Sequence, residues 1–399
     1  MSGFMGGSQR RMAFGAIVTA SVLGLSACGS VSGGGGPQAS DELPDTIKVV
    51  SINPTTGVVA FAGEAANKGY ELAIKEINEQ DYLEGTTIEI DYVDTKSEPQ
   101  TAAQEMTKAT AGGEVSAVFG SVSSNEAVAM SPLAEQRQMP TIYTQAGSDG
   151  VVVGDYTYRA TPLMREYYPL LKQYIEETGA QSLGIIYTEA TPTLQDIGSN
   201  TLPAMAEELG IEITASVGTQ ATTQDFSAPI SQVLGSEPDL VSVLLVGAAN
   251  PTAMTQLRQA GYDGPVLGNS GASAGNLDPA GEAGNGMVWA ADFNYQMSAT
   301  SSQEFVEAYN EEFGEDPLNY AAEAYDAAWF LARSLKEAQS ADRESVKDAM
   351  ATVAEESFDG ALGEGLTWVD NDLQVPGVVI EYSTDGEILL YEGEPAAAE

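Results

Sequence analysis

The chain has 399 residues, and 58 Asp and Glu against 16 Lys and Arg give it a formal net charge of -42 at pH 7. Nucleic-acid binders neutralise phosphates with clustered Lys and Arg, so this charge argues against a nucleic-acid partner. The lack of His excludes Ser-His-Asp and Cys-His catalysis and His-containing metal sites, and the single Cys excludes an intramolecular disulfide. Paired carboxylates are still available for catalysis, but no spacing singles out a pair. We expect no catalytic residue, metal or cofactor.

The first 27 residues have the pattern of an export signal. Arg10 and Arg11 precede an uncharged apolar run at 12–25, which is shorter than the roughly 18 to 20 residues of a membrane-spanning helix. The run ends in LSAC, which resembles the bacterial lipobox, with Cys28 as the acylated residue. We therefore expect a lipoprotein signal peptide at 1–27 and a lipid anchor to the membrane at Cys28. The alternative is an ordinary secretory signal followed by a chance cysteine.

Residues 28–45 are expected to be a flexible linker after the lipidated cysteine, because the stretch SVSGGGGPQAS at 30–40 has too little apolar surface to build a core. Removal of residues 1–27 takes away two positive charges, so the mature chain would carry 14 positive and 58 negative charges, or -44. The sequence predicts an acidic extracytoplasmic body on a lipid tether. A Gram-positive surface and a periplasm are both compatible with it.

From residue 46 onward, β-branched runs alternate with amphipathic stretches, which is typical of parallel sheets with βαβ connections. The first series predicts strands at 46–52, 87–93, 115–119 and 141–143, and helices at 64–77, 101–111 and 125–136. The second predicts strands at 183–187, 212–217, 240–246 and 265–267, and helices at 165–177, 194–209, 226–234 and 251–260. The last part predicts helices at 301–313, 319–338 and 343–353, and strands at 366–368, 377–382 and 388–391. The prediction is two doubly wound α/β lobes, the first with about four parallel strands, and a chain that re-crosses between them.

Ligands of open α/β sheets bind beyond the carboxyl ends of the strands, where helix N-termini present free N–H groups. After the strand at 115–119 the chain places Ser123 and Ser124 at the start of a helix, which suits a ligand carboxylate or carbonyl. The alternative is that Ser123 only forms a capping box with Glu126. The loop after 141–143, with Ala146 and Ser148, is also small and hydroxylated, and we expect the two loops to converge.

Other motifs are less specific. Phe61, in the loop after the first strand, either caps a ligand or packs on its own lobe. No phosphate loop occurs, and no dinucleotide fingerprint follows the first strand. A calcium loop opening at Asp370 would end at Glu381, but Val375 replaces the Gly that its sharp turn requires.

Six segments carry a resemblance to a known family. They are IKVVSINPTTGVVAFAGEAANKGYELAIKEIN at 47–78, AVFGSVSSNEAVAMSPLAEQRQMPTIYTQAGS at 117–148, YTYRATP at 156–162, TTQDFSAPISQVLGSEPDLV at 222–241, LRQAGYDGPVLG at 257–268 and FDGALGEGLTW at 358–368. By their order and spacing, residues 46–392 resemble the type I solute-binding proteins of ABC importers, in the leucine/isoleucine/valine-binding branch. The resemblance implies two Rossmann-like lobes joined by a three-crossing hinge, with the ligand between them. It implies lobe one at 46–162 plus 293–373 and lobe two at 163–292 plus 374–399.

The resemblance also implies site residues. The family's carboxylate-binding Ser falls on Ser124, its backbone acceptor for the ligand amine on Ala146, and its hydroxyl donor on Ser148. One family aromatic falls near Gly247, and Tyr320 is near an aromatic wall. The acid that pairs with the ligand ammonium falls on Ser270. A buried ammonium without that carboxylate would lose its charge partner, which argues against an ordinary amino acid as the ligand.

The sequence thus predicts a monomeric, lipid-anchored solute receptor, not an enzyme. It is expected to close on a small polar ligand, an amino acid or a related amide or carboxylate, and to deliver it to an ABC permease. One alternative ligand set is urea, amides or aromatic acids in place of branched-chain amino acids. A sensor module for a signalling partner is a second alternative, and a hydrolase on the same scaffold is a third.

Overall fold

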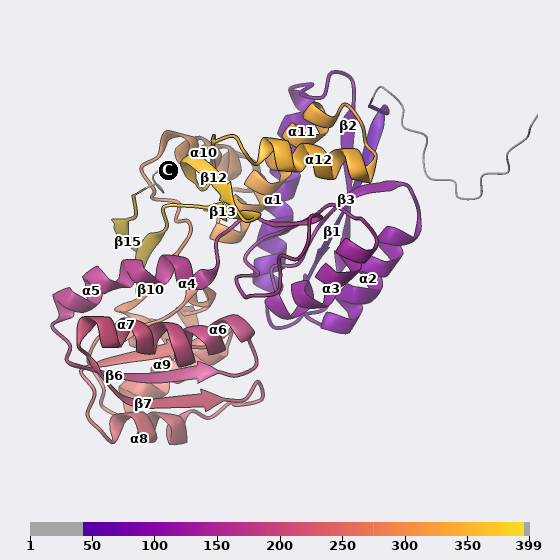
Figure 1. Ribbon diagram of the computed structural model, residues 1–399. Coiled ribbons are helices and arrows are strands. Elements are labelled where there is room, and N and C mark those ends of the chain that lie inside the picture. Colours follow the sequence, from indigo (N-terminus) through magenta and orange to yellow (C-terminus); the bar gives the residue numbers. More distant parts are fainter. Residues whose placement is uncertain (1–42, 274, 395–399) are drawn as a thin grey trace, which may run out of the picture. The chain divides into compact units, whose positions relative to one another are not determined.

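The computed structural model describes residues 43–273 and 275–394, in which α-helices alternate with the strands of two mixed sheets (Figure 1). The predicted signal peptide, Cys28 and the linker up to residue 42 lie outside the described residues. No helix in the described part is both long enough and apolar enough to cross a membrane.

The first sheet has eight strands in the order β11-β12-β13-β5-β4-β3-β1-β2. Their bounds are β1 (Thr46–Asn53), β2 (Thr87–Asp94), β3 (Val115–Phe119), β4 (Thr141–Tyr143), β5 (Thr157–Arg159), β11 (Phe358–Gly360), β12 (Gly363–Val369) and β13 (Asp372–Gln374). Strand β1 pairs in parallel with β2 and β3, and β4 continues the parallel set to β5. The carboxyl ends of β1, β3 and β4 therefore lie at one edge.

Helices cover both faces of this sheet, because successive residues of a strand point to opposite faces. Val49 packs in one core with α1 (Ala60–Glu79) and α11 (Asn319–Ala338), and Val50 packs in another with α2 (Pro99–Ala111) and α3 (Ser124–Gln136). Helix α1 approaches α11 so closely that a Cβ on Gly69 would lie 2.1 Å from the carbonyl oxygen of Ala321. The helices α10 (Thr300–Phe313) and α12 (Arg343–Val353) flank α11 in sequence.

The second sheet has seven strands in the order β15-β14-β10-β9-β8-β6-β7. Their bounds are β6 (Ser182–Thr188), β7 (Glu212–Thr219), β8 (Leu240–Leu244), β9 (Val266–Leu267), β10 (Met287–Ala291), β14 (Val378–Ser383) and β15 (Gly386–Glu392). Ile185 packs with the helices α4 (Met164–Tyr167), α5 (Leu171–Thr178), α6 (Pro192–Asp196) and α7 (Leu202–Leu209). Ile186 packs in the core of α8 (Ser227–Leu234) and α9 (Ala249–Gln259). This sheet is doubly wound as well.

The chain passes between the sheets three times, after β5, after β10 and after β13. The first two passages are tied together, because the Thr161 hydroxyl donates to Oδ2 of Asp292 at 2.7 Å. The predicted fold, two doubly wound α/β lobes with a three-crossing hinge, is confirmed. The lobe limits at residues 162, 292 and 373 stay predictions.

Several elements differ from expectation. The first sheet has eight strands, because β12, which was predicted at 366–368, adds to the four strands of the first series and the prediction missed β5, β11 and β13, each only three residues long. Strand β10 was also missed, since its fully buried sequence MVWAA shows no alternation. The helix expected at 165–177 is broken by a 3-10 turn at Tyr168–Leu170, and the one at 194–209 contains a π-helical segment, Ile197–Thr201. Pro169, which lacks a backbone N–H, is compatible with that break.

Candidate functional site

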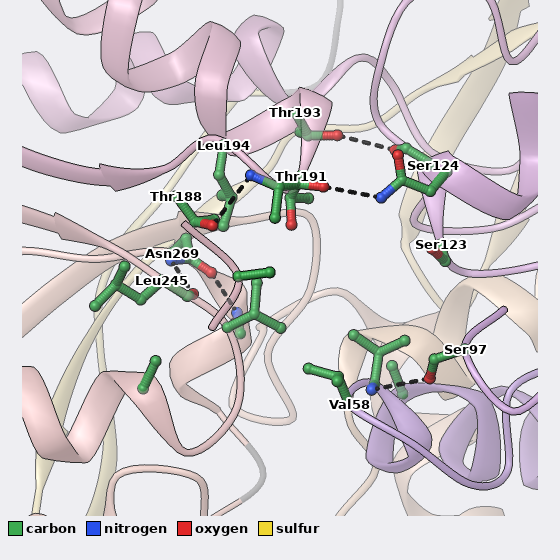
Figure 2. Close-up of a pocket in the computed structure, with 18 of the residues that line it drawn as sticks. Val58, Ser97, Ser123, Ser124, Thr188, Thr191, Thr193, Leu194, Leu245 and Asn269 are labelled. Atoms are coloured by element: carbon green, nitrogen blue, oxygen red, sulfur yellow. Dashed lines mark hydrogen bonds between the residues drawn. The ribbon is translucent and has the colours of Figure 1, made fainter. Parts of the chain in front are cut away.

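A cavity of about 360 Å³ lies where the loops that follow the parallel strands of both sheets meet (Figure 2). From the first sheet it is lined by residues that follow β1 and β3, including Val58, Phe61 and Ser123. From the second it is lined by residues that follow β6 to β9, including Thr191 and Asn269. The position agrees with the general rule for open α/β sheets. The volume is at the small end of the range for small-molecule sites.

Two hydrogen bonds cross the cavity. The hydroxyl groups of Ser124, at the start of α3, and Thr193, in α6, are 2.9 Å apart (Figure 2). Beside them, the Asn125 side-chain amide donates to the carbonyl oxygen of Ala190 at 3.0 Å. Thr193 and Ala190 both follow β6 of the second sheet, so they connect that sheet directly to the start of α3, which follows β3 of the first sheet.

The start of α3 is held by groups other than those expected. The backbone N–H of Val122 donates to Oδ1 of Asn53 at 2.9 Å, and that of Ser123 donates to the Ser121 hydroxyl at 3.0 Å. The same Ser121 hydroxyl donates to the carboxylate of Glu126. Ser123 is the N-cap residue, but its side chain makes no capping bond, so the capping-box alternative for Ser123 is wrong. Burial raises the pKa of Glu126 above its ordinary value.

Ala146 and Ser148 do not lie on the wall of this cavity, although Gln145 does. The carbonyl oxygens of both residues accept hydrogen bonds from one guanidinium nitrogen of Arg159, at 2.8 and 3.0 Å. Arg159 is buried and is itself fixed by two hydrogen bonds to Asp372, at 3.0 and 2.7 Å. These hydrogen bonds hold the loop that contains Ala146 and Ser148 beside Arg159, the last residue of β5, and Asp372, the first residue of β13. Ser148 borders a separate, smaller cavity of about 120 Å³.

An aromatic pair forms part of the wall. The rings of Phe61 and Tyr320 meet edge to face with centroids 5.7 Å apart. The Tyr320 hydroxyl donates to the carbonyl oxygen of Ser270 at 3.4 Å, which links α11 to the loop after β9. Burial raises the pKa of Tyr320, so the ring stays neutral. Gly247 is not on the wall, but its neighbours Val246 and Ala249 are.

The structure therefore brings together five of the predicted residues, Phe61, Ser123, Ser124, Ser270 and Tyr320. It adds residues that the sequence did not single out, all at or after the carboxyl ends of strands of the second sheet: Thr188, Thr191, Thr193, Phe226, Leu245 and Asn269. The rule that located the loops after β3 and β4 would have found them, because β6 to β9 were themselves predicted. Asn269 shapes this side by bonding the Leu245 carbonyl at 3.0 Å and the Gly271 N–H at 2.8 Å.

A buried carboxyl pair lies behind Gln145. The backbone N–H of Gln145 donates to the carboxyl group of Glu323, and the Asn319 amide donates to Glu323 at 3.0 Å and to Asp292 at 3.1 Å. Burial raises the pKa of Glu323 well above its ordinary value, and the neighbouring Asp292 raises it further. Among residues 43–273 and 275–394, no group of three or more Cys, Asp or Glu is arranged to hold a metal ion.

Comparisons with known proteins agree with this architecture. A family model described as periplasmic binding protein matches residues 46–387. A Leu/Ile/Val-binding protein homolog of Brucella abortus is 25% identical over 366 residues, covering 86% of this chain and 89% of that protein. A leucine binding protein of Thermotoga maritima superposes with a TM-score of 0.80 at 24% identity, covering 88% and 99% of the two chains. An ABC transporter solute binding protein of R. palustris in complex with benzoate gives 0.79 at 20% identity, covering 89% and 98%.

The family match spans most of the chain, and residues 46–387 include every residue of the cavity wall. The family is one of binding proteins, in agreement with the expectation that the chain is not an enzyme. The superposition on the Thermotoga protein shows that the fold is shared as well. The chain belongs to the periplasmic binding protein family.

Proposed function

We propose that the chain is the extracytoplasmic solute-binding component of an ABC importer. The observation that carries the proposal is the cavity itself, which is lined by loops of both sheets and bridged by Ser124 and Thr193. A ligand that contacts loops of both sheets favours the arrangement in which those loops are close, which is how such a protein closes on its solute. The closed form is then the one that the permease recognises.

The residues of the cavity wall would contribute to binding in two ways, by hydrogen bonds and by apolar contact. Ser123 and Ser124 supply hydroxyl groups at the start of α3, where the first backbone N–H groups of the helix have no intrahelical acceptor. Phe61 and Tyr320 supply apolar surface, and Ser270 supplies polar atoms from the second sheet. The site would hold one small solute by hydrogen bonds to its polar end and by contact with its apolar part. Binding is its whole chemistry.

The relatives support a small organic solute. The Brucella protein is named for Leu, Ile and Val, the Thermotoga protein for leucine, and the R. palustris protein was solved with benzoate. For this chain we propose a ligand in the same size range, an amino acid or a related amide or carboxylate.

The proposal includes a lipid anchor at Cys28. Acylation at Cys28 would hold the body at the outer face of the cell membrane, since two acyl chains give stable anchoring where one chain is marginal. Mass spectrometry of the membrane fraction tests this directly. We expect an acylated Cys28 as the first residue of the mature chain, and a soluble chain cut elsewhere would contradict the anchor.

Thermal unfolding tests the binding role. The purified full chain is melted with and without amino acids, amides, urea and aromatic acids, and hits are confirmed by calorimetry. A ligand at about a thousand times its dissociation constant adds roughly 4 kcal/mol to the free energy of unfolding and raises the melting temperature by several degrees. A panel in which no solute of any class binds would contradict the proposed function.

A further inference from the structure

Two buried acids meet where the chain passes between the sheets. Asp292 is the first residue after β10, on the second passage, and Glu323 lies in α11, which packs on the first sheet. Both residues are fully buried. They share one hydrogen-bond donor, because Nδ2 of Asn319 lies 3.1 Å from the carboxyl group of Asp292 and 3.0 Å from that of Glu323. Asp292 and Glu323, called the hinge pair below, therefore join the second passage to α11.

The hinge pair is also connected to the first passage and to the cavity wall. Thr161, on the first passage, donates to Asp292 at 2.7 Å. The backbone N–H of Gln145 donates to Glu323, and Gln145 lines the cavity. Gln145 has a φ of 26°, a left-handed conformation that few residues other than glycine adopt. The position of this wall residue therefore depends on the hinge pair.

No cation balances the hinge pair. In the part of the chain that the structure describes, no Lys or Arg forms an ion pair with Asp292 or Glu323. The titratable groups that act on the pair from neighbouring elements are Tyr70 of α1, Tyr167 of α4 and Tyr320 of α11, and burial raises the pKa of each, so all three are neutral. Two neighbouring carboxyl groups in a buried site without a cation do not both ionise.

The hydrogen bonds around Asn319 lead to the same conclusion. Its Nδ2 carries two hydrogens but faces three acceptors, which are the side-chain oxygen of Gln145 and one carboxyl oxygen each of Asp292 and Glu323. A proton on Glu323 supplies the missing donor. Burial and the neighbouring Asp292 raise the pKa of Glu323, in agreement with a retained proton.

We propose that closure of the cavity takes up one proton, which the hinge pair holds while the loops of the two sheets are in contact and releases when the passages move apart. Once water reaches the separated carboxyl groups, both can ionise. The closed form is therefore favoured at low pH, and the ratio of closed to open chains falls by at most about 10-fold per pH unit as pH rises. This regulation goes beyond the proposed function, since it acts through the hinge and not through the solute.

Fluorescence energy transfer tests the proposal without a solute. Cys28 is the only cysteine, so the full chain with Cys28→Ser can be labelled at two chosen positions. Gln104→Cys in α2 and Ser231→Cys in α8 provide exposed positions on helices that cover the first and the second sheet. Single-molecule measurements at a series of pH values give the ratio of closed to open chains. We expect this ratio to fall at least about 10-fold between about pH 5 and 8.

Three further variants carry the same labels. Glu323→Gln cannot ionise, so its ratio should change by less than about 2-fold over this range. Asp292→Asn removes the repulsion from the other side and should flatten the response as well, so that either variant suffices if the other unfolds. Asp326→Asn is the matched control, because Asp326 is also a buried acid of α11 but is bound by the backbone N–H groups of Ala361 and Leu362. It should keep the pH response of the wild type.

The wild-type measurement decides the question first. A ratio that does not change with pH overturns the proposal, and so does a fall that persists undiminished in Glu323→Gln or Asp292→Asn. A fall that is lost in these variants and kept in Asp326→Asn supports it. Because no solute is present, neither result bears on the proposed function, which the melting screen decides separately.

Discussion

The hydroxyl oxygens of Ser124 and Thr193 lie 2.9 Å apart, although they are 69 residues apart in sequence and follow strands of different sheets. This contact and the bond from Asn125 to Ala190 join the two loop regions that form the cavity. The hydroxyl pair is therefore the place where ligand binding and the approach of the two sheets are most directly coupled.

Removal of the Ser124 hydroxyl is expected to weaken ligand binding. A net hydrogen bond contributes about 0.5–1.5 kcal/mol, so Ser124→Ala should raise the dissociation constant by roughly 3- to 10-fold, and Thr193→Val should have a similar effect. Calorimetric titration of the best ligand from the melting screen measures both. Thr107→Val, which changes an exposed hydroxyl on α2, is the control. Equal affinities for all three variants would argue against a role of the pair in binding.

The pair formed by Arg159 and Asp372 should be essential for stability. Both side chains are largely buried, at 2% and 14% exposure, and breaking a buried pair leaves an uncompensated charge. We expect Asp372→Ala to lower the free energy of unfolding by about 3 kcal/mol or more. Asp149→Ala breaks an exposed pair with Arg165 and should cost less than about 1 kcal/mol. Urea unfolding of the two variants measures the contrast, and similar losses would contradict it.

Contact between α1 and α11 depends on a glycine. Gly69→Ala would place a Cβ 2.1 Å from the Ala321 carbonyl oxygen, so the helices must move apart. Although Ala favours helix by about 1 kcal/mol, the clash should exceed this gain, and we expect a net loss of at least about 2 kcal/mol. Gly112→Ala is the control, because its Cβ would meet no atom closer than 3.9 Å. Melting temperatures of the two variants give the comparison, and a stabilised Gly69→Ala protein would refute the close packing.

The carboxyl pair behind Gln145 should make stability depend on pH. Because burial and Asp292 raise the pKa of Glu323, the folded chain holds a proton that the unfolded chain releases near the ordinary value of 4.5. The contribution of Glu323 is therefore fully present below that value and is lost as pH rises, by at most about 1.4 kcal/mol per pH unit, until the raised pKa is reached.

Glu323→Gln mimics the protonated acid and should remove this contribution. We expect the stability advantage of the variant over the wild type to grow as pH rises from about 5 to 8, as measured by urea unfolding at each pH. Glu355→Gln, at an exposed position, should show no such trend. An advantage of Glu323→Gln that is constant over this range would show that the carboxyl group does not retain its proton on folding.

Much of the fold was predictable because its elements have strong local patterns. The bounds of β3, β4, α11 and α12 agree with the sequence prediction residue for residue. Three-residue strands such as β5 and β13 have no such pattern, since they are defined by partners far away in the chain. Strand β13, for example, pairs with β5 through Asp372 and Arg159, which are 213 residues apart.

Part of the site was predictable too, where its residues follow strands that the sequence indicates. Ser123 and Ser124 could be placed on the cavity because they follow a strand whose end was correctly located. Ala146 and Ser148 follow such a strand too, but Arg159 holds their carbonyl oxygens, and that interaction depends on the distant Asp372. Local sequence contains no signal for it.

A crystal structure of the full chain with the best ligand from the melting screen would show directly where the solute binds. We expect the ligand to lie between the start of α3, at Ser123 and Ser124, and the loop after β9, at Asn269 and Ser270, with an aromatic or aliphatic part against Phe61 or Tyr320. A ligand bound at the amino ends of the strands, on the opposite edge of the sheets, would contradict it.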